Sequence, residues 1–290
     1  MDDFPAAEPR LEPFASQQAG EPLEALSGLA ATQDFRSEGP WLSPAAQDVL
    51  LLLGRGGKLG RFGLGTAQEG LEELEAAGLV TGRGRLTAEG RLVASPLDGT
   101  SGSVQFAAAF GGQKSAFYGA LGREGVLVLA GPSCARLRMG DQGDPGRRQI
   151  DFLSLDQFFP ALAAWLGLGP SWLLDAEVSI SPEAVQARMS GVSGAEVPLL
   201  EKANAAVRHM WEQEWFIWQQ VDGRTGLQTG IQAGPAGTWQ LVNSARGLLL
   251  KPWPSAQAYR GLLQTVSAEL ASPFVEALPS RTGAAGDGVN

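Results

Sequence analysis

Ser133 is the side chain that comes nearest to a nucleophile motif. It stands in the pentapeptide Gly-Pro-Ser-Cys-Ala, directly after the apolar run Val126–Ala130. This pattern resembles the G-x-S-x-G elbow of hydrolases, with Ala in place of the last Gly, and Asp175 and His209 follow in the order of such a triad. An elbow must lead into a helix, whereas Arg136–Gly140 is predicted to be a strand or a loop. We therefore interpret Ser133 as part of a turn after an edge strand. An enzyme would need a pocket that joins Ser133 to His209.

Metal and cofactor sites lack the residues that they need. His209 is the only histidine and Cys134 the only cysteine, so a zinc site would have to be built mostly from carboxylates, and no spacing suggests one. The glycines within residues 54–65 match neither phosphate-binding pattern, and no predicted strand precedes them. We expect no catalytic residue, no metal and no cofactor.

Tryptophan is the remaining unusual feature, because the chain contains eight. Five of them lie between residues 211 and 253 in the C-terminal half: Trp211, Trp215, Trp218, Trp239 and Trp253. We expect most of them to pack in the core, since tryptophan buries a large area. One or two exposed rings would instead be natural anchors for a protein partner, so these five are the candidate protein-binding residues. The first three, together with Val207, share one helical face if a single helix continues that far.

The charge balance restricts the class of partner. The net charge is −9 and pI ≈ 4.8. Phosphate contacts need clustered lysine and arginine, so a nucleic-acid partner is disfavoured. Docking on an anionic membrane surface is disfavoured for the same reason. An acidic chain suits protein partners, although its sign alone identifies none of them.

Several features predict the compartment. A single thiol in a chain of 290 residues fits a reducing environment. Residues Met1–Pro5 have neither the basic nor the apolar region of a secretion signal. The longest apolar stretches, such as Val126–Ala130, are far short of the ~20 residues of a membrane span. We expect a soluble cytoplasmic protein with no membrane insertion.

Composition divides the chain into three parts. Residues 1–40 are rich in Pro, Ala, Glu and Gln and are predicted to be a disordered acidic arm, with room for one short helix at Pro22–Leu29. Residues 279–290 are predicted to be a disordered tail. Between them, residues 41–278 are expected to form a single α+β domain of two similar halves, about 41–170 and 171–278.

The first structured part resembles a winged helix. Ser43 and Pro44 are a good N-cap and first helical residue for a helix that ends near Leu53. A second helix is expected over 66–77 and a short hairpin over 79–86, before a third short helix capped by Thr87. This order leaves open a winged-helix transcriptional regulator with a C-terminal α+β sensor part.

DNA binding makes a demand that the second helix does not meet. A recognition helix should present basic or amide side chains to the major groove. This helix carries four glutamates, Glu69, Glu72, Glu73 and Glu75. Their charge would repel phosphates, so a structural or protein-binding lobe is the favoured interpretation. An exposed basic face on residues 54–91 would favour the regulator.

After Pro96 the hydrophobic period changes to two, which indicates strands. Strands are expected at 103–110, 116–121, 124–130, 135–139, 148–152, 176–180, 216–221, 227–232, 238–242 and 247–251. Helices are expected at 154–166, 182–189, 197–213 and 255–270. Ser154 and Gln157 form a capping-box pattern, and Ser181-Pro182 is a further start signal. The fold class is α+β, with antiparallel sheet and flanking helices in a quasi-two-fold arrangement.

One internal repeat supports the two halves. Ile150–Leu162 and Leu250–Leu262 both run from a strand, through a cap, into an amphipathic helix. Each stretch follows a predicted meander. A duplicated plan of three strands and a helix is therefore plausible.

The order of parts over residues 66–270 resembles the EspG-type chaperones of type VII secretion. The resemblance is carried by "LEELEAAGLV", the meander "VQFAAAFGG…SAFYGALGREGVLVLAG", the helix "FFPALAAWLGLGP" and the start signal "VSISPEAVQA". It implies a quasi-two-fold α+β fold and a non-enzymatic cytosolic adaptor. Such an adaptor binds one end of a helical-hairpin secretion substrate and keeps it soluble. No functional residue is carried over from the family.

Overall fold

The computed structural model describes residues 35–58, 64–98, 102–141, 143–169, 175–197, 203–222, 229–244 and 247–276. The predicted disorder of the arm (apart from 35–40) and of the tail lies outside these residues, as does the helix expected at Pro22–Leu29. The α-helices are α2 Pro44–Gly54, α3 Leu64–Ala76, α4 Ala88–Ala94, α5 Cys134–Arg138, α6 Leu155–Trp165, α7 Pro182–Met189, α8 Ala205–Glu212 and α9 Ser255–Glu276. Two 3₁₀ turns occupy Ser95–Leu97 and Gly234–Ala236.

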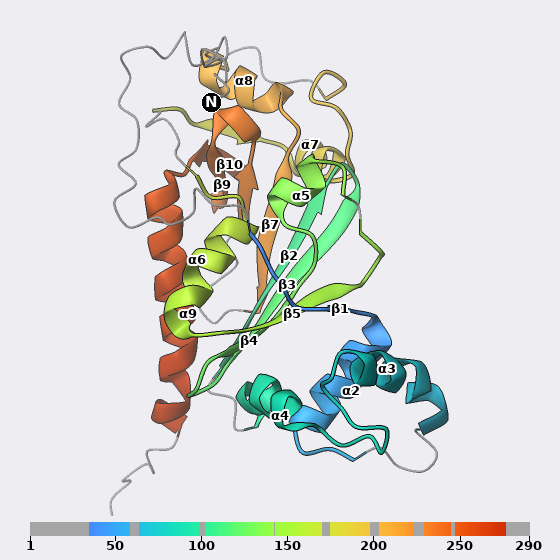
Figure 1. Ribbon diagram of the computed structural model, residues 1–290. Helices are drawn as coiled ribbons and strands as arrows, with labels where there is room; N and C mark the ends of the chain where they lie inside the picture. Colours follow the sequence, from blue (N-terminus) through green and yellow to red (C-terminus); the bar gives the residue numbers. More distant parts are fainter. Residues whose placement is uncertain are drawn as a thin grey trace, which may run out of the picture.

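The strands form one large antiparallel sheet (Figure 1). They are β1 Trp41–Leu42, β2 Gly102–Phe110, β3 Gln113–Leu121, β4 Val126–Ala130, β5 Arg148–Leu153, β6 Val178–Ile180, β7 Phe216–Asp222, β8 Thr229–Gln232, β9 Thr238–Ser244 and β10 Gly247–Pro252. Their order across the sheet is β1-β5-β4-β3-β2-β7-β8-β9-β10-β6. The predicted α+β class with an antiparallel sheet is confirmed.

The pairing of β2 with β7 lies in the middle of that order. From this pair outward, β2 to β5 follow one another on one side and β7 to β10 on the other, each in chain order. A short edge strand, β1 or β6, completes each side. Ala107 pairs with Gln219 at the junction, and the register shifts between Gln105 and Phe106, which marks a bulge.

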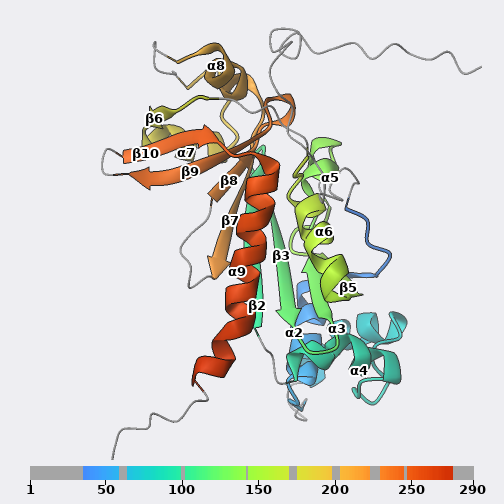
Figure 2. The same ribbon diagram turned by 90° about the vertical axis from the view of Figure 1, so that its left-hand side faces the viewer.

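One face of the sheet is covered by α5, α6 and α9, and Figure 2 shows α6 and α9 lying across the strands. Aromatic side chains fill this layer. Phe117 contacts both Phe158 and Trp165 of α6, with ring centroids 6.0 and 5.4 Å apart. Because these rings are fully buried, the layer contributes a large share of the apolar burial that stabilises the fold.

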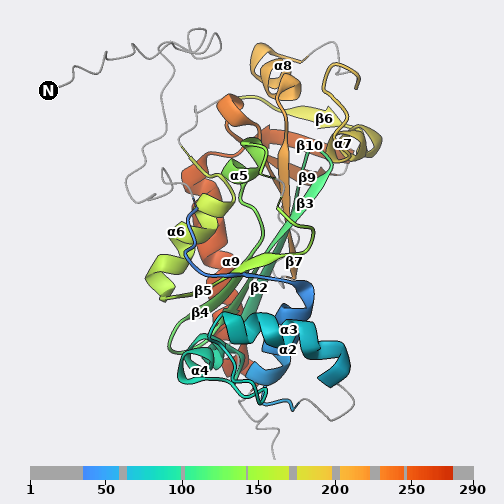
Figure 3. The ribbon, with the colours of Figure 1, turned by 45° about the vertical axis from the view of Figure 1, so that its right-hand side comes forward.

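The opposite face carries two separate helical covers. The lobe of α2, α3 and α4 buries Leu50 and Leu74 against β3, β4 and β5. Helices α7 and α8 bury Val207 and Met210 against β7 to β10. In Figure 3, α2 and α3 lie at one end of the molecule and α7 and α8 at the other.

The predicted helix starts are confirmed where a capping side chain is present. The Ser43 hydroxyl accepts from the amide of Ala46 at 3.2 Å, with Pro44 in the first turn of α2. Ser154 and Gln157 form the predicted capping box of α6. Thr87 caps α4, and Gly78 follows α3 with φ 74°. Each signal acts within one turn of the chain, so sequence alone reveals it.

Two predicted elements are wrong. The strand expected at 135–139 is helix α5, which Ser133 caps through the amide of Arg136 and which buries Cys134 and Leu137 on one face. The alternation read as a strand there fits a single helical turn equally well. The helix expected at 197–213 is α8, which begins at Ala205, after its cap Asn204, and ends at Glu212.

Candidate protein-binding surface

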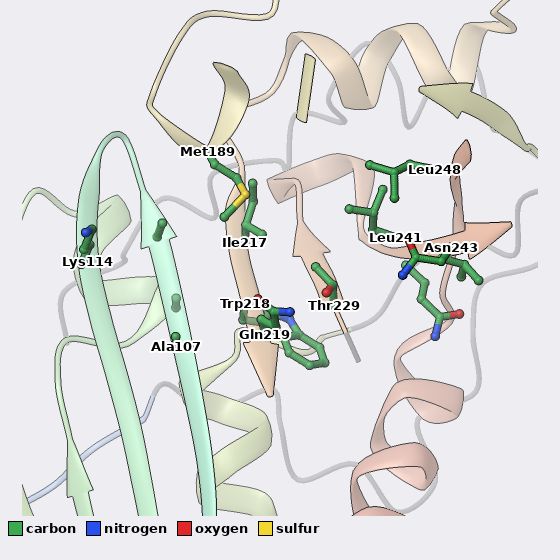
Figure 4. Close-up of a pocket in the computed structure, with 14 residues that line it drawn as sticks. Ala107, Lys114, Met189, Ile217, Trp218, Gln219, Thr229, Leu241, Asn243 and Leu248 are labelled. Carbon is green, nitrogen blue, oxygen red and sulfur yellow. The ribbon is translucent and has the colours of Figure 1, made fainter. Parts of the chain in front are cut away.

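The uncovered middle of the sheet forms a trough with a volume of about 690 Å³. It crosses the strands from β3 to β10, between the two helical covers. Figure 4 shows its lining residues, with Lys114 on one side and Leu241 and Leu248 on the other. Hairpins far apart in sequence therefore build one continuous surface.

Short side chains form the floor of the trough. Ala107 is exposed and Ala109 half-buried on β2, while Thr229 is half-buried on β8. Backbone pairing places Ala107 beside Gln219, and Gln219 beside Thr229. Directly opposed residues of an antiparallel sheet point to the same face, so this row faces the trough. A partner segment can approach the sheet closely over such small residues.

Apolar side chains gather at the β10 end. Leu241 and Leu248 are half-buried there, while the half-buried Met189 at the end of α7 lies beside the buried Ile217 of β7, between the two ends of the trough (Figure 4). Unbranched methionine adapts to irregular apolar surfaces. A half-buried apolar cluster in a concave site is the kind of surface that binds a partner side chain.

Arg188 holds the end of α7 that carries Met189. Arg188 is 7% exposed, and its guanidinium lies over the rings of Trp215 and Trp211, with 4.7 and 5.9 Å to the centroids. It donates to the carbonyls of Val192 and Gln213. Burial lowers the pKa of Arg188, and the charge of Glu214 opposes that effect. The arginine therefore ties α7 to the segment that follows α8.

The five candidate tryptophans are all buried, so none of them presents an exposed ring. The indole N–H groups of three of them donate to backbone carbonyls: Trp211 to Gly194 and Val197, Trp215 to Met210, and Trp239 to Ala236. Trp218 stacks on Trp253 with centroids 5.6 Å apart. The expected helical face is wrong beyond Trp211, because Trp215 follows α8 and Trp218 lies in β7.

Trp218 is the one candidate that also lines the trough. Its ring lies over β8, where a Cβ on Gly230 would come within 2.3 Å of the ring carbons. The other residues that line the trough were not predicted. Their sequence signal is weak, since an alanine run such as 107–109 on β2 is unremarkable until the sheet is assembled.

The context of Ser133 differs from the prediction, because a helix does follow the turn. Ser133 is nonetheless fully buried and its hydroxyl caps α5, whereas an elbow serine must be exposed to substrate. Burial also raises the pKa of the neighbouring Cys134 thiol, although Arg138 partly opposes this. The protonated thiol is a weak nucleophile.

The helical lobe presents both signs of charge. Glu69, Glu72 and Glu75 are exposed on α3. Glu73 instead forms an ion pair with Arg147 and accepts a hydrogen bond from the backbone amide of Ser43 at 3.0 Å. The ion pair joins the lobe to the segment that directly precedes β5. Exposed basic side chains lie elsewhere on the lobe: Arg55, Lys58, Arg83, Arg85 and Arg91.

Within the described ranges, no group of three or more metal-ligating side chains is present. No helix among those residues has the length and apolar character to cross a membrane. No protein-family model matches the chain, and no curated protein matches it.

Proposed function

We propose that this protein is a non-enzymatic cytosolic chaperone or adaptor, similar to the EspG-type chaperones, that binds helical-hairpin substrates of a type VII secretion system. The observation that carries the proposal is the trough at the centre of the sheet. A sheet face that carries small and apolar side chains, and over which the described residues place no helix between the two covers, is suited to the helix of another protein.

The strand order supports a quasi-two-fold arrangement, which the EspG resemblance implies. On either side of the junction between β2 and β7, four strands run outward in chain order, β2 to β5 and β7 to β10, and each series ends in a helix on the same face, α6 or α9. The trough lies over that central pair. In this proposal the substrate binds where the two halves meet.

The test is recovery of the partner from the native host. The tagged protein is purified from cytoplasm at moderate salt, and the chains that co-purify are identified. We expect a small helical-hairpin secretion substrate at a stable ratio. The variant Ala107→Trp, which fills the floor of the trough from an exposed strand position, should lose that substrate by about tenfold or more.

Ala76→Trp is the matched control, because Ala76 is exposed on α3 and does not line the trough. It should retain the substrate. Equal recovery with both variants would place the binding surface elsewhere on the molecule. Co-purification of DNA in place of a protein would refute the adaptor and favour the alternative.

That alternative is a winged-helix regulator with an α+β sensor part. The exposed Arg83 and Arg85, between α3 and α4, are the observation that favours it. The exposed glutamates of α3 oppose it, since they would face the phosphates.

A further inference from the structure

The trough has two chemically different ends. Lys114 is exposed on β3 at one end, and among the described lining residues it alone has an ionisable side chain. Leu241 and Leu248 are half-buried at the other end, on β9 and β10. Figure 4 shows these side chains on opposite sides of the lining. An occupant therefore meets a cation at one end and an apolar cluster at the other.

The length of the trough matches a helix of defined size. The order β3-β2-β7-β8-β9-β10 contains five strand spacings, each of about 4.8 Å, so the trough spans roughly 24 Å. An α-helix of about 16 residues has that length. The alanines of β2 at the floor, Ala107 and Ala109, let such a helix lie close to the sheet.

Lys114 is a local exception in an acidic molecule. The net charge is −9, and within the described part of the chain no carboxylate lies within salt-bridge distance of its ammonium group. The C-terminal end of a helix carries a partial negative charge and free carbonyl groups. A glutamate in the last helical turn adds a full charge to that end.

We propose that the trough binds one amphipathic helix of the partner along its length, with the acidic C-terminal turn at Lys114 and the apolar stripe at Leu241 and Leu248. This inference rests on the proposed function and adds the polarity and charge of the bound helix.

Three synthetic 16-residue peptides test this inference. All carry the same leucine stripe and a hydrocarbon staple that fixes the helix. One has two glutamates in its last turn, the second has two lysines there, and the third has the glutamates in its first turn. Binding of each labelled peptide to the full chain is measured by fluorescence anisotropy at low and high salt.

We expect the peptide with C-terminal glutamates to bind about three- to tenfold more tightly than either of the others at low salt. The net charge of the protein disfavours the C-terminal glutamate peptide relative to the lysine peptide and does not distinguish the two glutamate peptides, so this ranking must arise from a local cation. Lys114→Met should remove the preference for the peptide with C-terminal glutamates. Lys114→Glu should make the lysine peptide the tightest binder of the three. Lys58→Glu, at an exposed lysine that does not line the trough, should leave the ranking unchanged.

Equal binding of the three peptides, or a ranking that survives Lys114→Glu, would overturn the inference. Failure of every peptide to bind would also overturn it, and the proposed function would still stand if Ala107→Trp removes the native substrate. Absence of any native substrate would instead count against the proposed function itself.

Discussion

At the scale of single residues, Arg188 combines hydrogen bonds to backbone carbonyls with contacts to indole rings. A planar guanidinium can donate to two carbonyls and lie over indole rings at once, and an ammonium cannot. The contacts of Arg188 with Val192, Gln213, Trp211 and Trp215 use both abilities. Its position next to Met189 links this buried cation to the lining of the trough.

Arg188→Met should therefore lower the free energy of unfolding by about 2–3 kcal/mol, because two buried carbonyls lose a charged donor. Arg188→Lys should recover only a small part of that loss. Chemical denaturation followed by tryptophan fluorescence measures the change. Arg85→Met, at an exposed arginine of the lobe, should stay within about 0.5 kcal/mol of the parent protein. If Arg188→Met leaves the free energy of unfolding unchanged, the hydrogen bonds of Arg188 are not needed to hold α7.

At the scale of elements, β8 lies between β7 and β9 and contacts the aromatic layer through Trp218. The strand is only four residues long, and Gly230 in it pairs with Trp218 of β7 and with Gln240 of β9. The indole of Trp218 occupies the space where any larger residue would place its Cβ. The glycine is therefore required by the close approach of a ring rather than by a turn.

Gly230→Ala should destabilise the protein by about 1–3 kcal/mol, since the new methyl group must displace Trp218 from its stack on Trp253. A change in near-UV circular dichroism should accompany the loss. Gly169→Ala is the control, because a Cβ there meets nothing within 4 Å. If both variants have the same stability and spectrum, the ring can move aside without cost.

At the scale of the whole molecule, the two halves share one sheet. The central pair β2–β7 joins them along five registered residue pairs. Arg138 of α5 adds a second link, since it donates to the carbonyls of Glu214 and Gln232 in the other half at 3.1 and 2.8 Å. Separation would expose the bonding edges of both central strands.

Expressed alone, residues 41–170 and 171–278 should each fail to give a cooperative unfolding transition, because each half would lose the partner of its central strand. Urea denaturation monitored by far-UV circular dichroism and by fluorescence measures this. The full chain should show one transition that coincides by both probes. A half that unfolds cooperatively by itself would show two independent domains.

The sequence by itself determined the local elements of this protein. Ser43, Ser154 and Ser181 begin helices because a hydroxyl satisfies backbone amides within the same turn, and alternating apolar residues mark β2 and β3 because their two faces differ in burial. Such signals are complete within a few residues. These local signals fail where a segment fits both the strand and the helix period, as in α5.

Only the tertiary structure decided where the candidate site lies. The trough depends on the pairing of β2 with β7, between residues more than a hundred positions apart, and no local pattern specifies which strands become neighbours. The tryptophans illustrate the same limit. Their residue type allowed either a place in the core or a role as an exposed anchor for a partner, and the packing of the folded chain buries all five candidates. Burial depends on what the rest of the chain places opposite a side chain, which is the physical reason that the sheet, and not the sequence, located the surface.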